Sequence, residues 1–114
     1  MKKDKGDKER LQHIYDAICN IESFTQGFSE KDYLQNLLVQ SAVERQLEII
    51  GEACANISDK IKKKHTQVEW NKIKAFRNII AHEYFGVSSK QIWNVVQLEI
   101  SQLKISIQAI TKEI

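Results

Sequence analysis

Apolar residues recur along this chain at alternating spacings of three and four, which is the period of a helix with one buried face. The first such run lies between residues 7 and 26, and the second lies between residues 38 and 61. The runs consist of Leu11, Ile14, Ile18, Ile21 and Phe24, and then of Val43, Leu47, Ile50, Cys54, Ile57 and Ile61. The pattern predicts two long helices, and the unbroken seam of the second is typical of a helix that packs against another within or between subunits.

Turn and capping residues indicate where the first helix ends and a short one begins. Gly27 stands where a C-terminal cap belongs, because glycine accepts the left-handed backbone that ends many helices. Ser29 followed by Asp32 resembles an N-cap that opens a short helical turn through residues 33–34. We therefore expect the first helix to run from about Asp7 to Gln26, with one short helix before the second long one.

Two more helices follow from the same period. The apolar spacing predicts a third main helix from about Glu69 to His82. Ser88 with Gln91 has the pattern of a capping box and opens the last helix. The apolar face of that last helix consists of Ile92, Val96, Leu103, Ile107 and Ile110. Since no strand pattern or repeat occurs, the sequence predicts an all-α, up-and-down bundle of about four main helices plus a short one.

Two features of the second long helix allow more than one interpretation. Gly51 lies in its interior, where glycine costs about 1 kcal/mol relative to alanine. Close approach of a neighbouring backbone would explain this glycine, and a tolerated cost is the alternative. The basic run at residues 60–65 suits a helix C-terminus because of the helix dipole. We interpret this run as a solvated helix end, with phosphate contact as the less favoured alternative.

Composition narrows the class of protein. A chain of 114 residues fits a single domain over residues 1–114, and we expect residues 1–6 to form a disordered tail. No window approaches the roughly 18 apolar residues of a membrane span, and no signal peptide pattern opens the chain, so we expect a cytoplasmic protein. Cys19 and Cys54 fall on apolar helix faces, which favours reduced core thiols over a disulfide. The net charge of +2 neither favours nor excludes a polyanionic partner.

The candidate chemistry lies between residues 76 and 87. This segment places Arg77, Asn78, His82, Glu83 and Tyr84 within eight positions beside a predicted helix end. Arg77 and His82 are five residues apart, which leaves them about 140° out of phase on an ideal helix. They can serve one site only if the helix ends near His82. Asn78 and His82 are four apart and share a face, so the Asn78 amide could orient the imidazole.

These residue types suit phosphodiester cleavage without a metal. Arg77 offers a permanent charge for a phosphate, and His82 has the side chain whose ordinary pKa lies nearest neutrality. One such histidine per chain is too few for the two proton transfers, so a symmetric dimer would complete the site. The alternative is structural: Arg77 pairs with Glu83, and His82 is a satisfied residue at a helix end. His13, His65 and His82 show no metal-ligand spacing, so we expect neither a metal nor a cofactor.

The order Arg77, four residues, His82, one residue, Tyr84 resembles the Arg-x4-His-x-Tyr motif of HepT-like toxins, a branch of the HEPN ribonuclease superfamily. Further similarity extends over nearly the whole chain, at residues 16–18, 33–34, 47–53, 70, 77–78, 84–87 and 92–93. The resemblance implies a homodimeric, HEPN-like, metal-independent endoribonuclease that acts as the toxin of a type VII toxin–antitoxin pair. It further implies an MntA-like nucleotidyltransferase antitoxin that silences the nuclease by transferring AMP to Tyr84.

In the family pattern Arg77 and His82 match the catalytic arginine and histidine, whereas the supporting roles of Asn78 and Glu83 rest on spacing alone. One departure concerns the last helix, where family members often carry an Asp-Leu-Pro-like turn and this chain reads Leu-Glu-Ile at residues 98–100. Two other functions stay open. One is a non-catalytic module that binds a nucleotide or a nucleotidyltransferase, and the other is a purely structural dimerisation domain.

Overall fold

The described part of the chain is built of helices joined by short turns and loops. The computed structural model describes the backbone of residues 2–82 and 88–114, and the side chains of residues 6–80 and 88–114. In chain order the helices are α1 (Lys2–Thr25), α2 (Glu30–Leu34), α3 (Leu37–Ala55), α4 (Asp59–Lys64), α5 (Trp70–His82), α6 (Ser89–Leu98) and α7 (Ile100–Glu113). No residue in these ranges belongs to a strand, which confirms the predicted all-α class.

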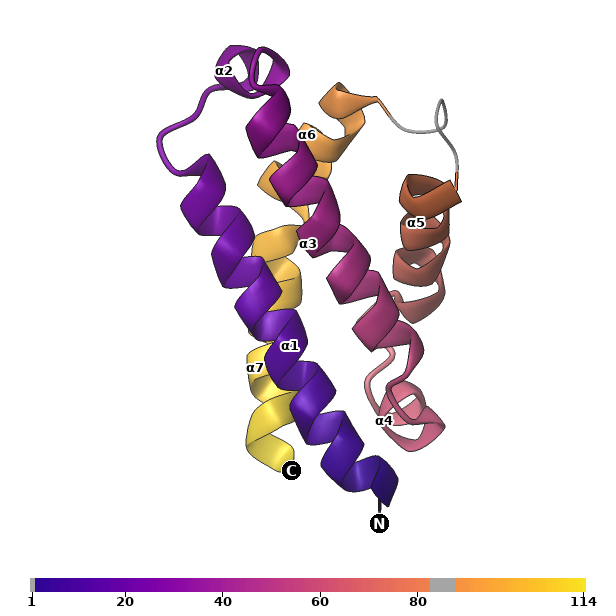
Figure 1. Cartoon of the computed structure of the whole chain (residues 1–114). Helices are drawn as coiled ribbons and strands as arrows, with labels where there is room; N and C mark the ends of the chain where they lie inside the picture. Colours follow the sequence, from indigo (N-terminus) through magenta and orange to yellow (C-terminus); the bar gives the residue numbers. More distant parts are fainter. Residues whose placement is uncertain (1, 83–87) are drawn as a thin grey trace.

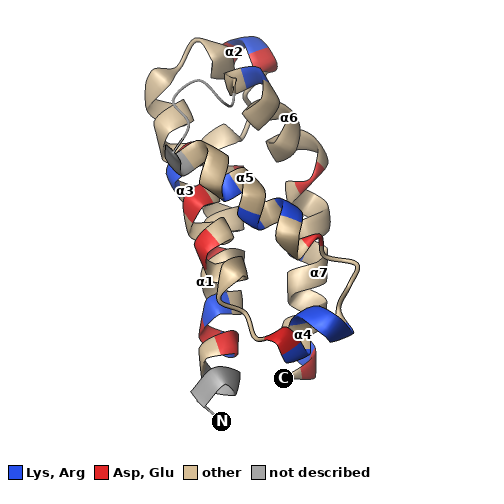
Figure 2. Cartoon of the chain, turned by 90° about the vertical axis from the view of Figure 1, so that its right-hand side faces the viewer, with Lys and Arg blue, Asp and Glu red and all other residues tan. Residues whose placement is uncertain are grey.

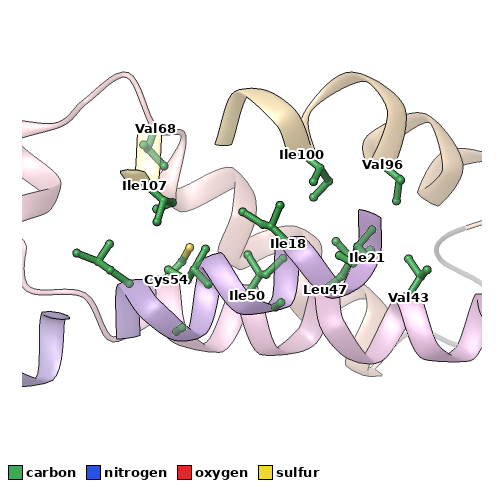
Figure 3. Packing of buried hydrophobic residues seen from close by; sticks show 14 of the residues in the cluster. Ile18, Ile21, Val43, Leu47, Ile50, Cys54, Val68, Val96, Ile100 and Ile107 are labelled. Carbon is green, nitrogen blue, oxygen red and sulfur yellow. The ribbon is translucent and has the colours of Figure 1, made fainter. Parts of the chain in front are cut away.

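The two long helices α1 and α3 lie antiparallel at the centre of the bundle (Figure 1). Helix α7 packs against α1, and α6 continues from α7 toward α2 and the start of α3. Helix α5 packs against α3 on the side away from α1 (Figure 1). The core lies between α1, α3 and the α6–α7 arm, where the apolar faces predicted from the sequence meet (Figure 3).

Local capping accounts for three of the predicted boundaries. Gly27 has a φ of 78°, which is the left-handed conformation expected of a residue that ends a helix. The Ser29 side chain accepts from the Asp32 backbone N–H at 3.1 Å, and the Asp32 carboxylate accepts from the Ser29 N–H at 3.0 Å. Ser88 and Gln91 make the equivalent reciprocal pair at the start of α6. Both capping boxes are therefore confirmed.

Helix α1 begins earlier than the sequence predicted. The structure places its start at Lys2 rather than Asp7, so the helix takes in residues 2–6, for which a disordered tail was expected. Adding a turn to an existing helix requires no new nucleation, and the lysines of this segment are good helix formers. An apolar pattern marks only buried apolar positions of a helix, and Leu11 is the first of these in α1 among the described side chains.

The predicted helix over residues 38–61 is in fact two helices. Helix α3 ends at Asn56, whose side-chain Nδ2 donates to the Glu52 carbonyl at 2.9 Å. Helix α4 then starts after Ser58, and the Ser58 N–H donates to Asp7 Oδ1 of α1 at 2.9 Å. This cap comes from a residue 51 positions away in sequence. A periodicity argument could not find the break, because Ile57 and Ile61 stay buried on both sides of it.

The last predicted helix is also divided, at Glu99. Glu99 ends α6 and precedes α7, with φ −118° and ψ −28°. Leu98 is 77% exposed while Ile100 is 4% exposed, so the bend returns the chain to the core within two residues. The division falls in the Leu-Glu-Ile segment where the family pattern carries a proline-containing turn, and this chain achieves it without proline.

The cysteines confirm the expectation of free thiols. Neither Cys19 nor Cys54 forms a disulfide, and Cys54 is fully buried between α1 and α3. Burial raises the pKa of the Cys54 thiol to about 12, so this side chain behaves as a small apolar group. Within the described ranges, no helix combines the length and the apolar character that crossing a bilayer requires.

Candidate active site

The start of α5 is fixed by a cluster that joins α4, α5 and α7. Trp70 is buried, and its indole Nε1 donates to the His65 backbone carbonyl at 3.0 Å. Glu113 near the end of α7 lies 3.4 Å from His65 Nε2 and 2.9 Å from Lys64 Nζ. The hydrogen bond from Lys64 lowers the pKa of Glu113. The first residue of α5 is therefore held in place, and the helix then runs along α3 as far as His82 (Figure 1).

Gly51 of α3 lies directly under Arg77 of α5. A Cβ atom added at Gly51 would overlap Cβ and Cγ of Arg77, and it would lie 3.5 Å from the Arg77 Cα. The prediction that Gly51 permits close approach of a neighbouring backbone is therefore confirmed, and its partner is the segment that carries the candidate catalytic arginine. The Arg77 side chain is half-buried, and its Nε is buried without a hydrogen-bond partner among the described residues.

The other predicted site residues are placed only in part. The backbone of α5 is described as far as His82, and the His82 side chain lies outside the described residues. That the helix ends near His82, as a shared role with Arg77 requires, stays a prediction. Asn78 is exposed on α5, four residues before His82. Glu83 and Tyr84 lie outside the described residues altogether. The catalytic, supporting and modification roles of these five residues stay predictions.

An apolar groove beside α5 was missed by the sequence analysis. It has a volume of about 450 Å³ and separates one side of α5 from the α6–α7 arm. Its apolar lining includes Ile73, Phe76 and Ile79 of α5 and Leu98, Ile100 and Leu103 of the arm. The apolar period assigned all these residues to helix faces, but it gives no information on which two faces remain apart in space.

The groove has exposed apolar walls and a charged rim. Ile79 is 36% exposed and Leu98 is 77% exposed. At the rim, Lys72 Nζ lies 3.7 Å from Glu69 Oε1 and 3.6 Å from Glu99 Oε1. An exposed apolar surface with a polar rim is typical of a protein interface.

Helices α5 and α3, which pack together, differ in the charge of their side chains. Helix α5 contains Lys72, Lys74 and Arg77 and has no aspartate or glutamate between Trp70 and His82. Figure 2 shows these basic residues along α5 and further lysines on α4, with acidic residues on α3 behind. Although the net charge is only +2, the local charge of α5 favours a phosphate-bearing ligand.

An acidic pair on α3 is a second feature that the sequence analysis did not identify. Glu44 and Glu48 are one turn apart, and the spacing 44, 48, 51 places both on the helix face that carries Gly51. Partial burial, and then the neighbouring charge of Glu48, raise the pKa of Glu44. Arg45 Nη1 contacts Glu48 Oε1 at 3.2 Å. The signal was present in the sequence as an i, i+4 pair of like charge.

Over the part of the chain that the structure describes, no three histidine, cysteine or acidic side chains lie together as a metal site.

The fold defines the protein as a small all-α bundle in which the basic helix α5 packs through Arg77 on Gly51 of α3. Comparison with known proteins makes the class specific. The family model described as "Ribonuclease HepT-like" matches residues 14–110, and the chain belongs to this family. The family assignment confirms the resemblance seen in the sequence.

Individual relatives agree with the family. A "Probable ribonuclease HepT" of Thermococcus cleftensis is 38% identical over 100 residues, which cover 88% of this chain and 91% of the relative. A "Putative RNase" of Caldanaerobacter subterraneus subsp. tengcongensis is 32% identical over 109 residues, covering 96% and 97%. A "Gamma-glutamylcyclotransferase and putative RNase" of Methanocaldococcus jannaschii is 36% identical over 110 residues, covering 96% of this chain and 50% of that protein. This chain thus spans half the length of the last relative. No solved structure gives a significant match.

Proposed function

We propose that this protein is a metal-independent endoribonuclease that uses Arg77 and His82. The observation that carries the proposal is the packing of Arg77 on Gly51 in the basic helix α5, which also includes His82. The family assignment supports RNA as the substrate class. A buried stem fixes the arginine, and a histidine at a helix end can turn toward the same phosphate.

The reaction needs two proton transfers and one stabilised charge. One His82 imidazole removes the proton of the ribose 2′-hydroxyl, and the 2′-oxygen attacks phosphorus. The guanidinium of Arg77 stabilises the added negative charge on the phosphoryl oxygens. The bond to the 5′-oxygen breaks, and a second imidazolium gives that oxygen its proton. The products are a 2′,3′-cyclic phosphate and a 5′-hydroxyl.

The second imidazole belongs to a second copy of the chain in our proposal. The groove between α5 and the α6–α7 arm suits self-association, because its walls are exposed and apolar. Its rim carries both signs of charge, at Lys72 and at Glu69 and Glu99, so two copies related by a two-fold axis can pair opposite charges. Since α5 forms one wall of the groove, this association brings the two α5 helices toward each other.

Regulation follows from the position of Tyr84, two residues after His82. We extend the proposal to a cytoplasmic toxin–antitoxin pair in which an MntA-like nucleotidyltransferase transfers AMP to the Tyr84 hydroxyl. The attached nucleotide would add bulk and negative charge beside the phosphate-binding groups, which would silence the nuclease. Asn78 keeps the supporting role of orienting the imidazole, and Glu83 is kept as a supporting residue on its spacing alone.

The test compares unmodified wild-type protein with His82→Ala, using His13→Ala as the matched control. His13 is an exposed histidine on α1, the long helix that packs against α3 and α7. With total RNA in the presence of EDTA, we expect His82→Ala to lose activity by about 10²- to 10⁴-fold. His13→Ala should match the wild type, and end-group analysis should find cyclic phosphates.

Two results would contradict the nuclease. Equal cleavage by wild type and by folded His82→Ala would remove the catalytic role of His82. No cleavage by wild type, after mass spectrometry shows Tyr84 to be unmodified, would favour a module that binds a nucleotide or a nucleotidyltransferase without catalysis.

A further inference from the structure

We infer that Gly51 is the positioning residue of Arg77: its missing side chain forms a notch in α3 that holds the arginine stem and aims its guanidinium at the substrate phosphate. The catalytic part of this inference rests on the proposed function. The notch itself rests only on the packing of α5 against α3.

The overlap at Gly51 differs in kind from an ordinary close contact. Gly6 in α1 also faces an arginine, and a Cβ there would lie 2.6 Å from Nη1 and 3.3 Å from Cζ of Arg10. Those atoms are the far end of a flexible side chain, which can turn away. At Gly51 the overlapping atoms are Cβ and Cγ of Arg77, and Cβ is fixed to the backbone of α5. A side chain at position 51 would therefore fit only if α5 itself moved.

A held stem has a catalytic consequence. An arginine side chain ordinarily loses considerable rotamer freedom when it binds a phosphate. When the neighbouring helix encloses the stem, part of that freedom is already lost on folding, so less is lost on binding. The buried Nε of Arg77 shows that the enclosure extends beyond Cγ to the base of the guanidinium. The outer nitrogens then approach the phosphate from a fixed direction, which is the condition for electrostatic stabilisation of a transition state.

A purely structural role for Gly51 makes a different prediction. If glycine only allowed α3 and α5 to pack, a side chain at position 51 would lower stability without a specific effect on turnover. If glycine aims Arg77, the same change would lower kcat far more than it raises KM. A misplacement of about 1 Å can cost on the order of 100-fold in rate.

The experiment compares Gly51→Ala with Gly6→Ala, two glycine-to-alanine changes that each face an arginine in a helix. We expect Gly51→Ala to lower kcat for RNA cleavage by on the order of 100-fold, with KM changed by less than about threefold. Gly6→Ala should keep the wild-type kcat. An unchanged kcat in folded Gly51→Ala, or equal losses in both variants, would overturn the inference.

A second measurement does not depend on activity. In a thermodynamic cycle, Gly51→Ala should lower the melting temperature in the wild-type background and fail to lower it in the Arg77→Gly background, where both overlapping atoms are gone. The Arg77 Nε–H resonance should shift in Gly51→Ala and keep its position in Gly6→Ala. Should Gly51→Ala alone fail to fold, recovery of folding by Arg77→Gly would support the notch, and no recovery would overturn it.

These readouts separate the two proposals. Absence of RNA cleavage by the wild type would sink the proposed function, while the cycle and the Nε–H resonance would still decide whether Gly51 holds Arg77. Cleavage by the wild type with additive effects in the cycle would leave the nuclease standing and overturn the notch.

Discussion

Helices α1 and α5 both pack against α3, but the bundle holds them differently. Helix α1 also packs against α7, and its residues Leu11, Ile14, Ile18 and Ile21 are fully buried. On α5 Trp70 is buried at the start of the helix, whereas the isoleucines and Phe76 that follow are only partly buried or exposed, and one side of the helix borders the open groove. The first arrangement supplies stability, whereas the second keeps an arginine and an apolar wall available for a ligand or partner.

This division agrees with a general property of proteins, since elements that bind or move come from the less stable parts of a structure. Helix α5 is attached at its start by the buried Trp70 and further along by the packing of Arg77 on Gly51, in place of a continuous buried face. Substitutions in the two regions should therefore have separable effects, the first on unfolding and the second on association and turnover.

The largest expected effect is on stability, and it is tested by replacing an isoleucine with alanine in the core and on α5. Ile107 of α7 is fully buried against α1, while Ile80 of α5 is partly buried. We expect Ile107→Ala to lower the free energy of unfolding by about 2–5 kcal/mol, because it leaves a cavity in the core. Ile80→Ala should cost about 1 kcal/mol. Urea unfolding followed by circular dichroism measures both, and equal costs would contradict the comparison.

The next effect concerns the groove. Leu98→Asp places a charge on its exposed apolar wall, and Ile105→Asp places one on an exposed isoleucine of α7 that does not line the groove. We expect Leu98→Asp to weaken dimerisation by at least about 30-fold, which corresponds to about 2 kcal/mol, and to remove RNA cleavage with it. Ile105→Asp should leave both unchanged. Sedimentation velocity across a concentration series measures the association of both variants. Equal association of the two would contradict the groove as the dimer interface.

Much of this fold could be predicted from local sequence. The period of the buried isoleucines gave the helices, and the pairs Ser29–Asp32 and Ser88–Gln91 gave two of their starts. The breaks at Asn56 and Glu99 could not be predicted, because they depend on partners distant in sequence. Asp7 caps α4 from α1, and Ile100 is drawn to a core that α1 completes.

Part of the candidate site could likewise be predicted from the sequence, and part could not. The residue types and spacing of Arg77 and His82 were enough to select them from the sequence, and the structure places both on α5. That Gly51 would meet Arg77, and not another residue, follows from the antiparallel course of α3 and α5, which no local pattern contains. The groove was hidden for the same reason, since it is a property of two helix faces that remain apart.

The smallest expected effect tests the acidic pair on the site-facing side of α3. Burial and the charge of Glu48 raise the pKa of Glu44, so the native state binds this proton more tightly than the unfolded state does. Ionised Glu44 therefore opposes folding, and the cost appears as pH rises through the raised pKa. Glu44→Gln should stabilise the protein at pH 7 by about 0.2–0.5 kcal/mol, the usual size of an i, i+4 repulsion.

The gain should disappear at low pH, where the Glu44 carboxyl is protonated in both the folded and the unfolded state. Melting temperatures of wild type and Glu44→Gln at pH 7 and pH 3.5 give the comparison, with Glu9→Gln as the control on an exposed position of α1 that has no acidic residue three or four positions away. A gain of equal size at both pH values would show that the substitution acts through packing. In that case the acidic pair would have no electrostatic part in the surface that α3 presents to α5.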